Sequence, residues 1–433
     1  MSSFRSAPSG VLSSRLIVAL IFAIFFCISF LTNILGPLIP DIILDFHVSM
    51  AMAAVLPFCF FIAYGVMSIP SGFLVERWGE KNLMILAFLA GTLGAATFAI
   101  FPTYHVATLS LFAMGAGMAA LQVAINPLLR VAGGPEHFAF NSAFAQLVFG
   151  SASFVSPMVY SYLVNHVGQP QAGDGALLTV LARLTPAHMP WVSIYWLFAV
   201  STAVLALVMT IVKLPVVDRS DDEAAGSLSM YATLFKNRTA WLYFFSIFVY
   251  VGSEQGTADW ISEFLARYHG LDPHVDGAAA VAYFWGLLTA GCLVGMILLK
   301  FFDSRRVLIG FSAGALVALT FALFGSAKIA VYAFPCIGLF ASIMWPVIAS
   351  LGLNSVQRHH GAFAGILCTG IMGGAIVPLI IGQLGDRYGL RSGMLVLYVT
   401  FGCIFSIGFW ACPLVSNARV GTKSPTAAPV SVT

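Results

Sequence analysis

Two carboxylates stand in an unusual place in this sequence. The segment YVGSEQGTADW (residues 250–260) carries Glu254 and Asp259 inside a stretch that is otherwise almost wholly apolar. In a bilayer a carboxylate costs several kcal/mol unless it faces a cavity or a partner, so such residues are usually functional. Glu254 lies about 14 residues into the stretch, or roughly 21 Å along a helix. We expect it to accept hydrogen bonds from a substrate, to bind a coupling proton or sodium ion, or both.

Two further carboxylates, Asp259 and Glu263, follow one and two helical turns beyond Glu254. An exterior vestibule at that depth would hydrate them, so ordinary solvation at a helix end is the favoured interpretation of both. Asp259 is nevertheless the second candidate, after Glu254, for the coupling-ion site.

Uncharged amides recur within the apolar stretches. Each amide both donates and accepts hydrogen bonds, which suits sugar hydroxyls that do the same. Tryptophan rings would supply apolar faces for a pyranose ring in a concave site. Alternatively, the amides bridge helices for packing and the tryptophans mark membrane interfaces. The predicted substrate-binding residues are Asn33, Gln122, Asn126, Gln146, Glu254, Gln255, Trp260, Trp285 and Trp345.

The composition places these residues in a membrane protein. Of the 433 residues, 60% are hydrophobic and only 9% are charged, against about 25% charged in soluble domains. Windows of roughly 20 residues, the length that spans hydrocarbon, predict an all-α integral membrane protein with twelve transmembrane helices. The predicted spans are 16–44, 51–75, 83–101, 106–129, 138–164, 191–213, 240–265, 277–300, 307–327, 330–353, 362–384 and 393–414.

The basic residues orient these spans. With both termini in the cytoplasm, 15 of the 20 lysines and arginines fall on the cytoplasmic side. The excess of positive charge in cytoplasmic loops predicts this orientation. The net charge of +3 is then a signal of topology, and nucleic acid is not an expected partner.

A polar, acidic segment divides the chain into two halves. It follows Lys213 and separates six predicted spans from six. Two six-helix bundles joined by a cytoplasmic linker are typical of alternating-access transporters, whose substrate binds between the halves. The predicted regions are a cytoplasmic tail (1–15), an N-terminal bundle (16–213), the linker (214–239), a C-terminal bundle (240–414) and a second cytoplasmic tail (415–433).

One predicted cytoplasmic turn carries a recognisable motif. GFLVERWGEKN (residues 72–82) resembles the G-x-L-x-D-R-x-G-R-K signature of the major facilitator superfamily, with Glu76 in place of the usual Asp. The glycines would allow a tight turn while the charges clamp the cytoplasmic side; alternatively, the charges only anchor helix ends. The predicted gating residues are Gly72, Glu76, Arg77, Gly79 and Lys81, with Asp303 and Arg305 in the corresponding turn of the second half.

Four motifs inside the spans are more specific. LQVAINP (121–127), YVGSE (250–254), SIMWP (342–346) and GGAIVP (373–378) together resemble the fucose-galactose-glucose/proton symporter family. The resemblance implies a hexose transporter of twelve helices, driven by protons or sodium and similar to the glucose/galactose branch. Asn33 and Gln122 stand where the fucose branch has its two proton-carrying carboxylates, so Glu254 is the deepest carboxylate left. Phe144 and Leu147 replace sugar-binding amides of the family pattern.

Other functions fit the sequence less well. An enzyme would need a nucleophile with its base, or metal ligands at suitable spacing, and none is found within the spans. The glycine-rich runs lack phosphate-binding spacing, and the seven cysteines stand singly, so neither a cofactor nor a metal is expected. The sequence therefore predicts a multi-pass inner-membrane transporter, acting as a monomer on a sugar. An uncoupled facilitator or an exporter of another small polar molecule stays open as the alternative, and a membrane enzyme or receptor as a remote one.

Overall fold

The computed structural model describes residues 14–134, 138–168, 175–215, 233–356 and 360–413, and every regular element within these ranges is helical. The predicted all-α class is therefore confirmed. Each of the twelve predicted spans coincides with one or more helices. The apolar runs form helices because a helix satisfies its own backbone hydrogen bonds, which hydrocarbon cannot do.

The N-terminal half of the chain contains seven α-helices and one short 3-10 helix within the described residues. They are α1 (Ser14–Thr32), α2 (Leu35–Phe46), α3 (Met50–Ile100), α4 (Tyr104–Gly133), α5 (Phe138–Val167), α6 (Ala176–Leu184), η2 (Pro190–Val192) and α7 (Ser193–Ile211).

The C-terminal half is also helical within the described residues, but its helices are interrupted more often. Its elements are α9 (Arg238–Ala258), α10 (Ile261–His269), η3 (Pro273–Gly277), α11 (Ala278–Phe301), α12 (Ser304–Phe324), α13 (Ala327–Ala341), α14 (Met344–Leu353), α15 (His360–Thr369), η4 (Gly370–Met372), α16 (Gly373–Tyr388), α17 (Leu390–Met394) and α18 (Val396–Trp410).

Several spans predicted as continuous helices are interrupted. The span 16–44 breaks between α1 and α2, 240–265 between α9 and α10, and 330–353 between α13 and α14. Proline explains two of these breaks, because Pro37 and Pro346 have no N–H to bond the carbonyl four residues earlier. In the second case the Ser342 carbonyl accepts a hydrogen bond from the Cys292 thiol instead, at 3.2 Å. Interrupted helices leave backbone groups available near the middle of a transporter.

The opposite deviation occurs in α3. Its 51 residues contain both predicted spans 51–75 and 83–101, joined through Gly79, which has φ 77° and ψ 161°. That conformation lies in the region that favours glycine. The tight turn expected of the motif glycine is therefore present.

The structure establishes a multi-pass membrane protein. Ten helical segments in the described part of the chain are long and apolar enough to cross a bilayer, and α3, which contains two helices, is counted as one of them. The helix α9, which carries Glu254, is not among the ten. The count of twelve spans and the cytoplasmic placement of the termini stay predictions.

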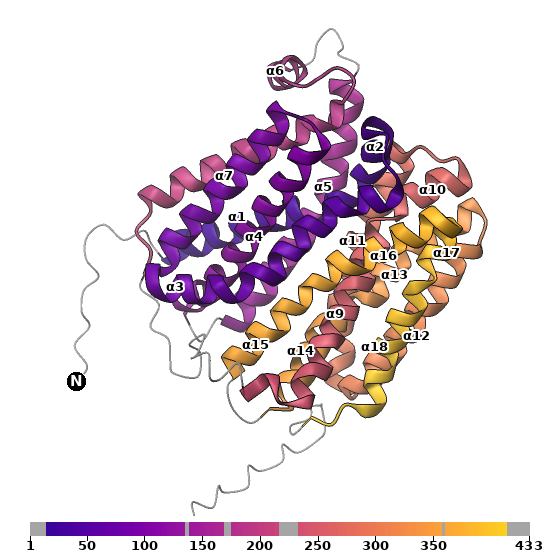
Figure 1. The fold of residues 1–433 in the computed structure, drawn as a ribbon. Helices are drawn as coiled ribbons and strands as arrows, with labels where there is room; N and C mark the ends of the chain where they lie inside the picture. The colour runs from indigo at the N-terminus through magenta and orange to yellow at the C-terminus, as the bar shows by residue number, and fades with distance from the viewer. Residues whose placement is uncertain (1–13, 135–137, 169–174, 216–232, 357–359, 414–433) are drawn as a thin grey trace, which may run out of the picture.

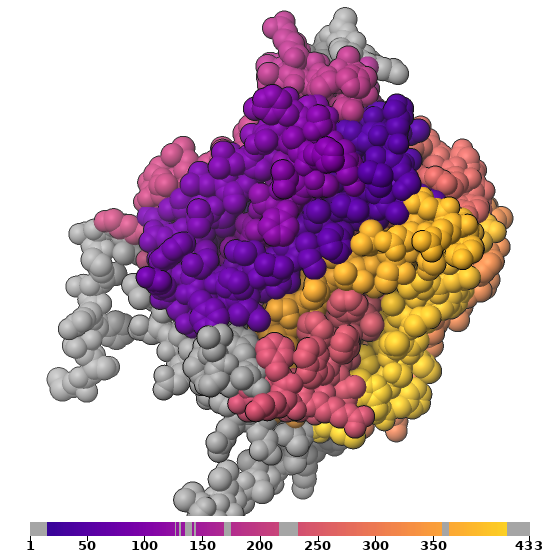
Figure 2. Space-filling model, viewed as in Figure 1, coloured from indigo at the N-terminus to yellow at the C-terminus, as the bar shows by residue number. Residues whose placement is uncertain are grey.

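The two halves of the chain form two groups of helices. Figure 1 shows α1 to α7 on one side and α9 to α18 on the other, and Figure 2 shows the same division on the surface. The groups meet where α3 packs against α16, α5 against α11 and α2 against α10. Any site between the halves must lie along these contacts. The exact boundaries of the bundles and the linker stay predictions.

Candidate substrate and gating site

Asn33 lies at the seam between the halves, in the break between α1 and α2. Only 4% of its surface is exposed. Its amide nitrogen donates to Ser153 Oγ of α5 at 2.8 Å, and its amide oxygen accepts from Gln255 Nε2 of α9 at 3.4 Å. The structure thus brings together two predicted site residues that are 222 positions apart. The Gln255 contact is long for a hydrogen bond, so a ligand hydroxyl can replace it at little cost.

Glu254 lies next to Gln255 on α9 and is half-buried. The hydroxyl of Tyr250, one turn earlier, interacts with its carboxylate. The Tyr250 ring in turn lies 6.3 Å from the Trp345 ring of α14, centroid to centroid. Glu254, Tyr250 and Trp345 therefore form one cluster. Glu254 and Trp345 were predicted from the sequence. Tyr250 was missed, although it is the first residue of the YVGSE motif that contains Glu254.

The remaining predicted amides are less well defined. Gln122 is half-buried on α4. Asn126 belongs to the same helix, but its side chain lies outside the described residues. Gln146 on α5 is exposed, as are Phe144 and Leu147.

The other two predicted tryptophans are almost fully buried. Trp260 is 0% exposed, and its ring nitrogen donates to the Pro378 carbonyl at 3.2 Å. This indole therefore packs between α9, α10 and α16. Trp285 on α11 is 3% exposed, and its ring nitrogen has no hydrogen-bond partner among the described residues. A buried N–H of this kind is a donor that a ligand can use.

The expectation that Asp259 and Glu263 are solvated at a helix end is wrong. Asp259 is 2% exposed and Glu263 7% exposed. The Glu263 carboxylate pairs with Arg267 at 2.6 Å. Asp259 stands at the break between α9 and α10, where Gly36 of α2 packs against it, and one of its carboxylate oxygens has no hydrogen-bond partner in the described residues. Sequence could not show this burial, because α2 covers the site from the other half.

The hydrogen bonds described for Lys81 and Asp303, two of the predicted cytoplasmic gating residues, do not cross between the halves. Lys81 donates to the Thr210 and Val212 carbonyls at the end of α7, both at 2.8 Å. A lysine at this position donates hydrogen bonds to the free carbonyls at the end of a helix. Its positive charge also interacts favourably with the negative end of the helix dipole. Asp303 caps α12 by accepting from the Arg305 backbone N–H at 2.9 Å. The remaining motif residues lie at or beside the turn: Gly72 is half-buried, Glu76 and Arg77 are exposed, and Gly79 makes the turn itself.

The opposite side, predicted to face the exterior and called the exterior here, carries bonds that cross the seam. Asp386 at the end of α16 accepts from the backbone N–H groups of Met50 and Ala51 at 2.9 Å each. These N–H groups open α3, so a carboxylate from one half caps a helix of the other. The exterior side of the seam is therefore closed in this structure.

Asp386 belongs to a repeat of the gating motif that the sequence analysis missed. GQLGDRYGLR (382–391) follows the same pattern as GFLVERWGEK (72–81), with an acidic residue, an arginine, an aromatic residue and a glycine in the same places. Gly389 has φ 85° and ψ 148°, close to the values of Gly79. Aligning the two turns in the sequence would have found Asp386.

Removing the Asp386 carboxylate is expected to loosen the exterior side. Asp386→Ala would lose two cap bonds, about 0.5 to 1 kcal/mol at this exposed position, so the open state should gain a few-fold. Distances between spin labels at Phe101 and Lys328, which are exposed on the exterior of opposite halves, would report the shift. Gln383→Ala, an exposed neighbour on the same helix, is the control. An unchanged distance distribution in Asp386→Ala would show that the cap does not hold the halves together.

Two groups of interrupted helices, with buried polar contacts at their seam and a closed exterior side, define a membrane transporter. The chain belongs to the Major Facilitator Superfamily, whose sequence profile matches residues 21–378. It is 32% identical over 380 residues to a glucose/galactose transporter of Brucella abortus, covering 86% of this chain and 88% of that protein. It is 26% identical over 392 residues to the L-fucose-proton symporter of Escherichia coli, covering 85% and 86% of the two chains.

Solved structures confirm the fold. The crystal structure of the Escherichia coli fucose:proton symporter has a TM-score of 0.65 at 22% identity, covering 93% of this chain and 100% of that chain. A bacterial homologue of the human lysosomal transporter Spinster, in an inward-facing and occupied conformation, has a TM-score of 0.74 at 14% identity, covering 92% and 96%. The expected family and the major facilitator fold are both confirmed, and the family is one of transporters rather than enzymes.

Proposed function

We propose that this protein carries a hexose-type sugar across the bacterial inner membrane by alternating access, coupled to a proton or sodium ion. The similarity to proteins named glucose/galactose transporter and L-fucose-proton symporter supports the substrate class. The observation that carries the proposal is the buried amide contact between Asn33 and Gln255, which joins the two halves where a substrate would bind.

The substrate site is built from groups on both sides of that contact. Asn33, Gln122 and Gln255 present amides that hydrogen-bond to hydroxyl groups in either direction. Asn33 and Gln255 bond to each other in this structure, and a sugar hydroxyl would take the place of each partner. Asn126 is included on sequence grounds, because it is four residues from Gln122.

The C-terminal half supplies the apolar wall and a charged acceptor. Trp345, lying against Tyr250, offers a ring face to the pyranose, and Glu254 accepts from a hydroxyl while Tyr250 orients it. The unpartnered N–H of Trp285 is a further donor. Trp260 and Gln146 contribute less, since the first is bonded within the protein and the second is exposed.

Two carboxylates, the half-buried Glu254 and the buried Asp259, are candidates for the coupling-ion site. Glu254 has a hydroxyl partner, whereas Asp259 has an oxygen without a partner and is covered by Gly36 while the exterior is closed. An ionised carboxylate without a partner is costly in such surroundings. When the halves separate on the exterior side, Asp259 would meet water. Glu254 remains the first candidate because it adjoins the substrate amides, and Asp259 is the second.

Sugar uptake into proteoliposomes with imposed ion gradients tests this function. Wild-type protein should accumulate radiolabelled glucose or galactose when a proton or sodium gradient is imposed. Glu254→Gln should still exchange sugar across the membrane but lose gradient-driven accumulation, because it mimics a permanently protonated carboxylate. Accumulation lost in Asp259→Asn and retained in Glu254→Gln would move the coupling site to Asp259.

A control substitution should leave this behaviour unchanged. Glu223→Gln removes a carboxylate from the predicted linker, away from the spans. Sugar equilibration without accumulation in the wild type would indicate an uncoupled facilitator. An absence of any hexose movement by folded protein would exclude the proposed substrate class.

A further inference from the structure

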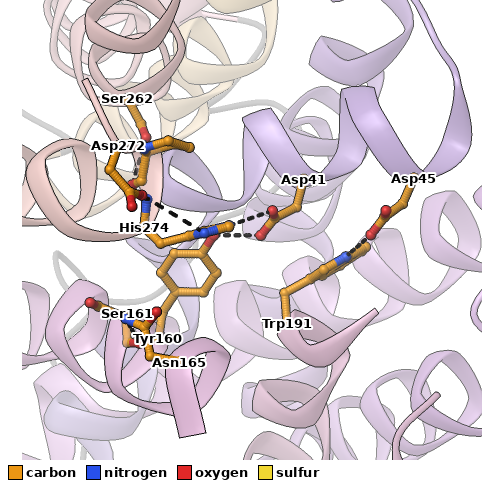
Figure 3. A network of polar contacts seen from close by, with 10 residues as sticks. Asp41, Asp45, Tyr160, Ser161, Asn165, Trp191, Ser262, Asp272 and His274 are labelled. Carbon is orange, nitrogen blue, oxygen red and sulfur yellow. Dashed lines mark hydrogen bonds and ion pairs between the residues drawn. The ribbon is translucent and has the colours of Figure 1, made fainter. Parts of the chain in front are cut away.

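A second polar cluster crosses the seam on the exterior side, apart from the substrate site. His274 Nε2 lies 2.7 Å from Asp41 Oδ1, and the Tyr160 hydroxyl donates to the other oxygen of the same carboxylate. Figure 3 shows the imidazole and the phenol converging on Asp41. The Asp41 side chain is 9% exposed and that of His274 is 30% exposed, so the imidazole can be reached from the exterior.

The members of this cluster come from opposite halves. Asp41 stands on α2 and Tyr160 on α5, whereas His274 stands on η3, which packs against both helices. The backbone around His274 is fixed from its own half, because Asp272 accepts from the His274 N–H at 2.7 Å. The hydroxyl of Ser262 donates to the Pro273 carbonyl at 3.2 Å. Separation of the halves on this side must therefore break the contact between Asp41 and His274.

We propose that Asp41, Tyr160 and His274 form an exterior gate that binds a proton as it closes, so that exterior pH sets the balance between closed and open states. The proposal rests on the alternating access proposed above. Tyr160 is a positioning residue, because its bond fixes the carboxylate that receives the imidazole.

The charges around His274 decide the direction of the effect. Asp41 faces its Nε2 atom, and Asp272 lies 3.9 Å from its Nδ1 atom. The negative charge of Asp45 on α2 also favours the protonated imidazole. Asp276 belongs to the same turn. A fully protonated ring thus directs both N–H groups toward carboxylates, an arrangement that stabilises its positive charge.

The other elements packed on η3 do not offset these carboxylates. On α10, Glu263 and Arg267 pair with each other at 2.6 Å. The first charged residue of α11 is Lys300, at the far end of that helix. On α5, Tyr160 is a hydrogen-bond donor to Asp41. Asp45 is itself held by the Trp191 ring N–H at 2.6 Å.

The sign of the pH dependence follows from these contacts. In the open state His274 faces water, and in the closed state it faces carboxylates, so the closed state binds the proton more tightly. Lowering the pH from about 8 to about 6 should therefore favour closure, by at most about tenfold per pH unit for one proton.

Spin-label distances between positions 101 and 328 test the gate. The protein, with its seven native cysteines replaced, would be reconstituted in lipid nanodiscs and measured between pH 5.5 and 8.5 without sugar. With the wild-type residues at the gate, the fraction of protein that is closed on the exterior side should rise as the pH falls. In His274→Gln, which keeps an N–H donor but does not titrate, the closed fraction should be constant over this range.

Three further variants make the result decisive. His166→Gln, at a half-buried histidine on the exterior end of α5, should keep the wild-type pH response. Asp41→Asn should lose the response, and Tyr160→Phe should keep it with a smaller closed fraction. A pH response in His274→Gln equal to that of the wild type, or no response in the wild type, would overturn the proposal.

The gate and the transport function can fail separately. The distance measurement needs no sugar, so it reports the gate even if uptake assays find that hexoses are not carried. Conversely, hexose accumulation together with a pH-independent distance distribution would leave the transport function standing and reject the gate.

Discussion

Gly36→Val is expected to hold the protein open to the exterior and to reduce net sugar uptake at least tenfold. A Cβ atom at Gly36 would lie 2.4 Å from the Ala258 carbonyl oxygen and 3.1 Å from the Asp259 Cα atom, both in the opposite half. Backbone atoms cannot move aside as a flexible side chain can. Overpacking of this kind costs about 1 to 3 kcal/mol in a packed interior, and separation of the halves would relieve it.

The measurements for this variant separate closure from folding. Uptake into proteoliposomes should fall while sugar binding from the exterior is retained, and the distance between labels at positions 101 and 328 should increase. Gly310→Val is the matched control, because a Cβ atom at Gly310 on α12 meets nothing within 4 Å. Wild-type uptake by Gly36→Val would mean that the halves do not close through this contact.

Gln122→Ala is expected to abolish measurable hexose binding while the protein stays folded. Each hydrogen bond lost to a buried hydroxyl costs about 1 to 3 kcal/mol, and an amide that donates and accepts would lose two. Affinity should therefore fall by about 30-fold or more. Titration calorimetry with glucose and galactose measures the loss.

A second glutamine provides the control for this loss. Gln383→Ala, at an exposed position of α16, should bind sugar as the wild type does, and thermal unfolding should be similar for both variants. Unchanged calorimetry in Gln122→Ala would remove Gln122 from the proposed site.

The fold could be predicted from the sequence because a bilayer imposes strong rules on composition. Runs of about 20 apolar residues form helices, and the glycine motif placed a tight turn at Gly79, which the structure shows. The helix breaks were less visible. Pro37 and Pro346 were signals for two of them, whereas the break at Asp259 and Trp260 contains no proline.

The site was only partly predictable for a different reason. The pairing of Asn33 with Gln255 joins two residues that could be chosen separately as deep amides, but their contact depends on how the halves pack. The gate residues Asp41 and His274 were missed, because they lie near predicted span ends, where solvated charges are ordinary. Asp41 and His274 are 233 positions apart in the chain, and only their contact across the two halves makes them notable.

The polarity of α9 has a consequence for how the protein reaches its membrane. This helix is not among those apolar enough to cross a bilayer by composition, since Glu254 and Gln255 lower its preference for hydrocarbon during insertion. Its stabilising partners come later in the chain: α9 packs against α16 and α18, and Ser253 bonds to Thr400 at 2.6 Å. Synthesis must therefore proceed almost to the last helix before α9 has its full set of neighbours. The residues that we propose for substrate and ion binding on this helix thus make its integration into the membrane dependent on helices near the C-terminal end of the chain.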